Sequence, residues 1–171
     1  MSLVMPTVAL KVVTDITLEL LDSLHIKAIL LDVDNTLALH GSQKPFDGAV
    51  EWTKMVREHG IQIVIISNNL RRRVAPFAAQ FELPFIPSAN KPFRYGINKA
   101  RKLLGLTSAE ILIVGDQVFT DILGANLFRM KSVLLEPVDN EDSLTFRFRR
   151  WLEKRVRRKI EQIKKEDGYV C

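Results

Sequence analysis

The sequence predicts an open α/β fold, in which a parallel β-sheet is covered by helices on both faces. Short, unbroken apolar runs recur along the chain, and segments with helical spacing lie between them. Unbroken runs are typical of strands buried on both faces, and their alternation with helices is typical of a parallel sheet. The 171 residues, 47% hydrophobic and 26% charged, suffice for one globular core. We therefore expect one domain over residues 1–171.

The individual elements follow from these patterns in order. Three helices are predicted by apolar residues three or four positions apart, at 50–56, 70–78 and 97–104, with Gly105 closing the third. Sheets of this kind bind ligands beyond the carboxyl ends of their strands. The five runs of strand length are Ala28–Leu31, Ile61–Ile66, Phe85–Ile86, Ile111–Val114 and Ser132–Leu135.

Composition excludes several classes of protein. No apolar run approaches the roughly 20 residues that a membrane span requires. The first residues, MSLVMPTVALK, lack a basic stretch followed by a long apolar one, so we expect no secretory signal. The single cysteine, Cys171, excludes an internal disulfide and a thiolate metal cluster. A cytoplasmic location fits these features.

The most informative stretch is ILLDVDNTLALH, residues 29–40, where a buried strand ends in two carboxylates. Side chains two apart on a strand point the same way, so Asp32 and Asp34 face one site if the strand geometry persists. Carboxylates held this close require a cation between them or a retained proton. Asp116 ends a later strand and adds a third, and oxygen-only ligands suit Mg²⁺. The alternative interpretation is that Asp34 and Asn35 only cap a turn.

Four short motifs occur in order along the chain. They are Asp32-Val33-Asp34-Asn35-Thr36-Leu37, Ser67 at a strand end, Lys91 in Ala89-Asn90-Lys91-Pro92, and Gly115-Asp116 followed by Asp121. With these motifs the chain resembles the haloacid dehalogenase (HAD) superfamily of phosphohydrolases over about residues 27–137. The resemblance is closest to the YqeG-like branch of subfamily IIIA, which is similar to phosphatidylglycerophosphate phosphatases. It implies a Rossmann-like three-layer fold.

This resemblance implies a role for each motif residue. Asp32 would attack phosphorus and carry an aspartyl-phosphate. Asp34 would protonate the leaving oxygen and then activate water. Ser67 and Lys91 would hold the phosphoryl oxygens. The implied Mg²⁺ ligands are Asp32, the backbone carbonyl of Asp34, and Asp116, with Asp121 in support.

The spacing of the motifs leaves no room for a cap domain. About ten residues separate the first motif from the next helix, and one helix with a short strand fits between Ser67 and Lys91. We expect an open site that suits a bulky phosphomonoester. The resemblance to the YqeG-like branch implies phosphatidylglycerophosphate as the favoured substrate, and a nucleotide, sugar phosphate or phosphoprotein is the alternative. An RNA- or ribosome-binding module with a vestigial site is an alternative of another class.

An arginine cluster follows the second motif. If Asn69 caps the next helix, Arg71, Arg72 and Arg73 occupy its first turn, where positive charge opposes the helix dipole. They either bind a second anionic group of the substrate or form a solvated surface cluster. Thr36, which supports the loop after the nucleophile, and Asn68 complete the predicted substrate contacts.

The basic character of the chain lies at its C-terminal end. Residues 145–166 hold ten Lys and Arg against three Asp and Glu, whereas the rest has 15 against 17. A basic helix is expected over about 142–166. It either packs on the body or lies on an anionic membrane, as a peripheral contact at its inner face, or on nucleic acid. Its apolar stripe comprises Phe148, Trp151, Leu152, Val156, Ile160 and Ile163.

Overall fold

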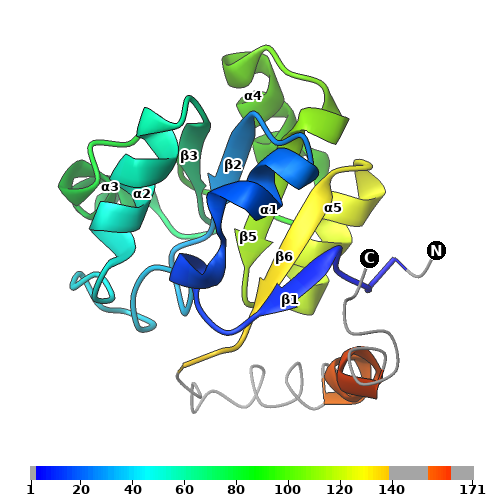
Figure 1. Cartoon of the computed structure of the whole chain (residues 1–171). Helices are drawn as coiled ribbons and strands as arrows, with labels where there is room; N and C mark the ends of the chain where they lie inside the picture. The colour runs from blue at the N-terminus through cyan, green and yellow to red at the C-terminus, as the bar shows by residue number, and fades with distance from the viewer. Residues whose placement is uncertain (1–2, 139–153, 163–171) are drawn as a thin grey trace.

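The computed structural model describes residues 3–138 and 154–162, and it contains a parallel sheet of six strands (Figure 1). Their order across the sheet is β1-β6-β5-β2-β3-β4. The predicted α/β class is confirmed, and each of the five predicted strands forms with its bounds shifted by at most one residue. The strands are β1 (Val8–Leu10), β2 (Ala28–Leu31), β3 (Gln62–Ile66), β4 (Phe85–Ile86), β5 (Ile111–Gly115) and β6 (Lys131–Leu135).

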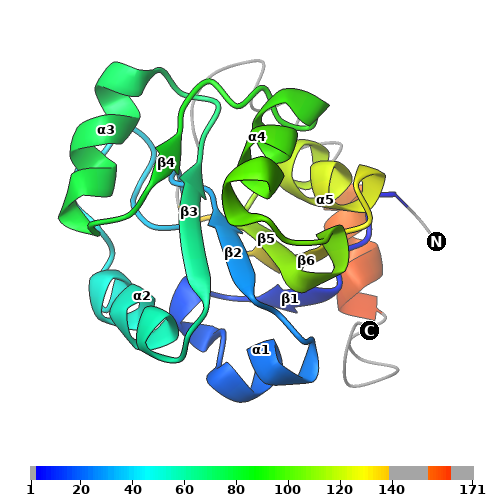
Figure 2. The same cartoon turned by 90° about the horizontal axis from the view of Figure 1, so that it is seen from above.

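Helices cover both faces of this sheet, as Figure 2 shows. On one face lie α1 (Leu18–Ser23), α2 (Ala49–Glu58) and α3 (Arg71–Gln80), and on the other lie α4 (Arg94–Leu104) and α5 (Leu123–Leu127). Successive residues of the central strand β2 alternate between the two resulting cores. Burial on both sides is the reason that its sequence reads as an unbroken apolar run.

The three predicted helices correspond to α2, α3 and α4. Gly105 ends α4 in the left-handed region, at φ 66°, as its position predicts. The sequence analysis did not predict β1, α1 or α5. Each of these elements is short, and β1 is a half-buried edge strand of three residues, so none gives a clear periodic signal. No cap domain interrupts residues 3–138.

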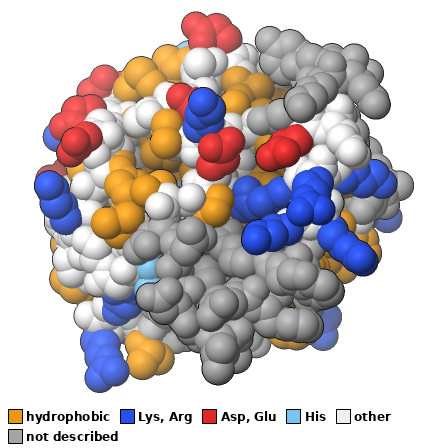
Figure 3. Space-filling model, turned by 90° about the horizontal axis from the view of Figure 1, so that it is seen from below, with side chains coloured by type: hydrophobic (Ala, Val, Ile, Leu, Met, Phe, Trp, Pro, Cys, Tyr) orange, Lys and Arg blue, Asp and Glu red, His pale blue; other side chains and the backbone are white. Residues whose placement is uncertain are grey.

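The C-terminal helix is described at residues 154–162. Ile160 is 3% exposed and packs against Val118, Ile122 and Leu134, so this part of the predicted helix packs on the body. Phe148, Trp151, Leu152 and Ile163 lie outside the described residues. The exposed basic side chains are Lys154, Arg155, Arg158 and Lys159, and blue side chains gather on this face in Figure 3. No helix in the described ranges is long and apolar enough to cross a membrane.

Candidate active site

Four loops meet at the carboxyl ends of β2, β3, β4 and β5, and each carries one of the sequence motifs. Asp32 follows β2, Ser67 follows β3, Lys91 lies in the loop between β4 and α4, and Asp116 follows β5. Each of these side chains is buried, with at most 6% of its surface exposed. The fold therefore gathers polar groups from distant parts of the chain at one buried place.

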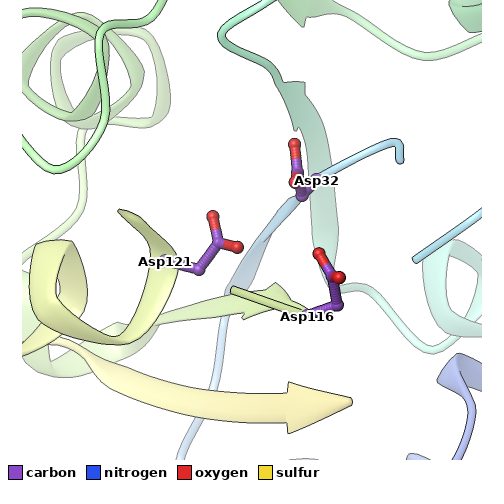
Figure 4. A group of neighbouring side chains, drawn as sticks. All are labelled: Asp32, Asp116 and Asp121. Atoms are coloured by element: carbon purple, nitrogen blue, oxygen red, sulfur yellow. The ribbon is translucent and has the colours of Figure 1, made fainter. Parts of the chain in front are cut away.

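Three carboxylates form the centre of this site. One oxygen from each of Asp32, Asp116 and Asp121 lies within 4.8 Å of the other two, and Figure 4 shows the three groups. Asp121 comes from a π-helical turn, η3 (Val118–Ile122), that directly follows the strand end. The Asp34 side chain is not part of this group.

Gly115 allows Asp121 to approach the strand end. A Cβ atom at position 115 would lie 2.2 Å from the Oδ2 atom of Asp121. That distance is far below van der Waals contact, so only glycine leaves room for the carboxylate. The same Oδ2 atom accepts a hydrogen bond of 3.2 Å from the backbone N–H of Gln117. Gly115 and Gln117 together fix where the Asp121 carboxylate lies.

Lys91 is the cation of the buried site. Its Nζ lies 2.9 Å from Asp32 Oδ1 and 2.6 Å from Asp121 Oδ1. Burial alone lowers the pKa of Lys91, but Asp121 and Asp32 outweigh this effect and raise that pKa above its usual value. Lys91 is therefore a permanent positive charge between two carboxylates.

Burial has the opposite consequence for the carboxyl groups. Burial raises the pKa of Asp32 to about 7 although Lys91 opposes the rise, and the neighbouring Asp121 and Asp34 charges add to it. Burial likewise raises the pKa of Asp121 above its usual value, against Lys91 and with a further contribution from Asp116. Three carboxyl groups thus share one lysine, and an added cation would favour their ionised forms.

The donor set fits a hard divalent cation. Carboxylate oxygens alone are the ligands that Mg²⁺ and Mn²⁺ prefer in proteins, and three are gathered here from separate loops. A divalent cation would also stabilise the ionised form of Asp32 and Asp121, whose protonation burial favours. Asp32, Asp116 and Asp121 are therefore the residues suited to hold a metal ion.

Asn68 positions Lys91. Its Oδ1 accepts a hydrogen bond of 2.7 Å from the Lys91 N–H, and its Nδ2 donates one of 3.1 Å to the Lys91 carbonyl. Both ends of the amide are thus engaged with the backbone of the third motif. Ser67 is 1% exposed, and its Oγ accepts a hydrogen bond of 3.1 Å from the N–H of Asn69.

Asp34 lies beside a second polar cluster, formed by α3, the loop before it and the loop after the first motif. Its Oδ1 pairs with the Arg73 guanidinium and lies 3.4 Å from His40 Nδ1. Its Oδ2 accepts a hydrogen bond of 2.5 Å from Asn69 Nδ2. The backbone N–H of Gly41 donates another, at 3.2 Å to Oδ1. The orientation of the Asp34 carboxylate is fixed from several sides.

These contacts change the interpretation of several residues. Asn69 is not the N-cap of α3, because Leu70 occupies that position without a side-chain cap, and Asn69 instead binds Asp34. Arg71 and Arg72 are both exposed, and Arg71 lies over the Phe85 ring, at 5.2 Å from its centroid. The three arginines do begin α3 as predicted, but only Arg73 reaches the buried carboxylates through a described contact.

The loop after Asp32 also contains the turn that the alternative interpretation predicts. Asn35 adopts φ 54°, and the backbone N–H groups of Thr36 and Leu37 both donate to the Val33 carbonyl. Thr36 itself is 2% exposed. Asn35 therefore serves the turn, whereas the Asp32 and Asp34 carboxylates contact polar side chains from other loops and from α3.

Comparison with known proteins shows the family. A sequence model of the haloacid dehalogenase-like hydrolases matches residues 22–128. The chain is 35% identical over 152 residues to the probable phosphatase YqeG of Bacillus subtilis (strain 168), which covers 89% of this chain and 88% of that protein. The chain therefore belongs to the haloacid dehalogenase-like hydrolase family. Within that family it is a phosphatase that hydrolyses phosphoric monoesters, as the four motifs predict.

Further relatives give weaker likenesses. The chain is 28% identical over 148 residues to phosphatidylglycerophosphate phosphatase 1, chloroplastic/mitochondrial, of Arabidopsis thaliana, which covers 81% of this chain but only 42% of that protein. An uncharacterized protein from Listeria monocytogenes serotype 4b has a similar structure, with a TM-score of 0.56 at 16% identity over 69% of this chain and 85% of that one. A haloacid dehalogenase-like hydrolase from Brucella suis 1330 has a TM-score of 0.50 at 14% identity over 72% and 98%. These two structures agree with the fold alone.

Proposed function

We propose that the protein is a Mg²⁺-dependent phosphomonoesterase that works through an aspartyl-phosphate on Asp32, and that residues 1–171 act as one unit. The observation that carries this proposal is the buried group of Asp32, Asp116, Asp121 and Lys91. A soluble protein rarely buries so many charged groups unless a ligand or a reaction requires them.

The proposed reaction has two steps. An Asp32 oxygen attacks phosphorus, the bond from phosphorus to the leaving oxygen breaks, and Asp34 gives that oxygen a proton. A water molecule then attacks the phosphorus of the aspartyl-phosphate while Asp34 takes its proton, which releases phosphate and restores Asp32. The contacts of Asp34 with Arg73 and Asn69 support this assignment because they hold the carboxylate in one orientation.

Lys91 and Ser67 are proposed to bind the phosphoryl oxygens. Lys91 Nζ already lies 2.9 Å from the nucleophile, so its charge is placed where negative charge gathers during transfer. Asn68 contributes by fixing the Lys91 backbone, and Thr36 by supporting the loop. Bound Mg²⁺ would supply charge neutralisation of the phosphoryl group, held by Asp32, Asp116 and Asp121 with the Asp34 carbonyl.

The proposed substrate is phosphatidylglycerophosphate. The named activity of the Arabidopsis thaliana relative supports it. So do exposed apolar side chains that follow three of the motifs, because a lipid substrate is presented at an apolar interface. Leu39 is 42% exposed, Leu70 57% and Phe93 64%. Arg71, Arg72 and Arg73 are proposed to bind the phosphodiester that remains on the product, and Arg73 reaches the site.

A peripheral membrane contact belongs to the same proposal. The described part of the C-terminal helix supports it less than the sequence alone did, because Ile160 is turned into the body. Lys154 and Lys159 remain exposed and suit anionic lipid, with each basic side chain near such a surface contributing about 1 kcal/mol.

Phosphate release tests both parts of the proposal. Wild-type protein is expected to hydrolyse p-nitrophenyl phosphate with Mg²⁺, and to prefer phosphatidylglycerophosphate in mixed micelles over soluble nucleotides, sugar phosphates and a phosphopeptide. Replacing Arg71, Arg72 and Arg73 by Ala should reduce the lipid activity more than the p-nitrophenyl phosphate activity. A preference for a soluble substrate would contradict the proposal that the substrate is a lipid. Tight RNA binding without any hydrolysis would favour the binding-module alternative.

A further inference from the structure

The C-terminal helix contacts the active-site end of the sheet through Arg157. Its guanidinium donates a hydrogen bond of 2.5 Å to the backbone carbonyl of Asp116 and one of 3.2 Å to that of Leu135. Asp116 directly follows β5, and Leu135 is the last residue of β6. One side chain therefore joins the carboxyl ends of two neighbouring strands, 41 and 22 residues away in the chain.

Arginine suits this bridging position for a geometric reason. Its planar guanidinium holds several N–H donors in a fixed fork, so two carbonyls can be bound at once without further loss of side-chain freedom. A lysine at the same place would present a single point charge. Arg157 is partly buried, whereas its neighbour Arg158 is exposed.

The same helix supports the second metal-binding carboxylate by packing. Ile160 contacts Val118 and Ile122, the first and last residues of the π-helical turn that carries Asp121. This turn is fully buried at both of these positions. Asp116 is thus held through its backbone carbonyl, and Asp121 through the turn on which it lies, by side chains one helical turn apart.

We propose that Arg157 is a positioning residue of the metal site, and that residues 154–162 form a part of the active site that the four motifs do not include. This inference rests on the proposed function, since it takes Asp116 and Asp121 as metal ligands. Partners outside the ligand set commonly matter in this way, because they fix the direction in which a ligand atom points. The basic C-terminal segment then has a role even without a membrane or RNA.

Metal affinity is the measurement that tests this role directly. Metal-free protein is titrated with Mn²⁺, and free Mn²⁺ is followed by electron paramagnetic resonance, so no turnover is needed. Arg157→Gln is expected to raise the Kd for Mn²⁺ about 10–100-fold, the range typical of lost supporting partners. Arg157→Lys, which keeps the charge and loses the fork, is expected to weaken binding as well. The matched control is Arg158→Gln, which removes the same charge from an exposed neighbour.

The sign of the effect separates positioning from a general charge effect. Removing a positive charge near a cation site favours cation binding by Coulomb's law, so a purely electrostatic role predicts tighter Mn²⁺ binding in both glutamine variants. Weaker binding in Arg157→Gln alone supports the positioning role. Thermal unfolding in EDTA establishes whether each variant is folded. If Arg157→Gln does not fold, the Mn²⁺ affinity of Arg157→Lys tests the positioning role in its place.

Two results would overturn the inference: equal Mn²⁺ affinity in the Arg157 variants and Arg158→Gln, or no Mn²⁺ binding by the wild type. Failure of the proposed function is a different result, namely wild-type protein that binds Mn²⁺ but releases no phosphate from any substrate tested. In that case the effect of Arg157 on metal affinity can still be measured.

Discussion

The central strand β2 has an ion pair near each of its ends, and the two pairs have the same N–O distance. At the amino end, Lys27 Nζ lies 2.6 Å from Glu110 Oε1, and at the carboxyl end Lys91 Nζ lies 2.6 Å from Asp121 Oδ1. The side chains of the first pair are 65% and 25% exposed, and those of the second 2% and 0%. The pairs differ in their access to water.

This difference reverses the direction in which the pKa of the carboxyl group shifts in the two pairs, Glu110 in the first and Asp121 in the second. Hydrogen bonds from Lys27 and Thr107 lower the pKa of Glu110 to about 2, because water still solvates the charged form. Burial raises the pKa of Asp121 despite a lysine at the same distance. An ion pair at a given distance can therefore be a minor surface contact or a reactive centre, and desolvation decides which.

The largest effect is expected at Asp32, the proposed nucleophile. Asp32→Asn keeps the size of the side chain but removes the attacking oxygen, so kcat should fall at least ~10⁴-fold. Hydrolysis of p-nitrophenyl phosphate with Mg²⁺ measures this. The variant should also carry no acid-stable, hydroxylamine-sensitive phosphate after incubation with a labelled substrate. Retention of wild-type activity would exclude Asp32 as the nucleophile.

The buried cation should matter far more than its exposed counterpart. Lys91→Met leaves Asp32 and Asp121 in a buried place without their lysine, and removing one partner of a buried pair costs about 3–5 kcal/mol. A fall in kcat of about 10²–10³-fold should accompany this loss of stability. Urea unfolding in EDTA measures the stability. The control is Lys27→Met at the other end of β2, and equal losses in both variants would contradict the comparison.

The close approach of Asp121 to Gly115 offers a test of the site at the carboxyl ends of the strands. Gly115→Ala places a Cβ 2.2 Å from the Asp121 carboxylate, which must move, so the Mg²⁺ concentration for half-maximal activity should rise about 10–100-fold. Gly105→Ala is the control. It adds a Cβ in open space at a left-handed position, which should cost roughly 1–2 kcal/mol of stability without altering the Mg²⁺ requirement. Unchanged Mg²⁺ dependence in Gly115→Ala would remove Asp121 from the metal site.

The Asp34–Arg73 pair is intermediate, with side chains 8% and 24% exposed. If Arg73 orients Asp34 as the proposed general acid, Arg73→Ala should slow the hydrolysis of alkyl phosphates about 10-fold more than that of p-nitrophenyl phosphate. The reason is that a good leaving group needs little protonation. A role in folding alone would slow both classes equally. Comparing kcat for the two classes, with exposed Arg72→Ala as the control, distinguishes these outcomes.

The sequence was sufficient to predict which residues lie at the carboxyl ends of the parallel strands. It was not sufficient to predict the contacts between the loops. Asp32, Ser67, Lys91 and Asp116 each end or follow an apolar run, and parallel strands bring such positions together whatever the helices do. Their positions therefore predicted that these residues gather at one edge of the sheet. The short edge strand β1 has no such signal, because three half-buried residues show no period.

Contacts made by single side chains could not be predicted in the same way. Asn69 has the composition of a helix cap, and only the path of the chain shows that its amide reaches Asp34 instead. Arg157 is one of ten basic residues in its segment. Its position beside the apolar residues Val156 and Ile160 was the available clue, since a residue flanking a buried stripe lies at the boundary of the body.

The smallest effect is expected at the exposed pair, and its pH dependence gives the sharpest contrast with the buried site. The pKa of Glu110 is lowered in the folded protein, so the pair stabilises the fold above the unfolded value near 4.5, and this contribution is lost as the pH falls toward 2. Glu110→Gln should therefore lower the urea midpoint slightly at pH 7. The difference from wild type should shrink in 1 M salt, where the Debye length is about 3 Å, and as the pH falls below 4.5. Urea unfolding at several pH values measures this. A difference that persists in salt and at low pH would mean that Glu110 acts through its hydrogen bonds with Thr107, at 2.6 and 3.0 Å, rather than through its charge.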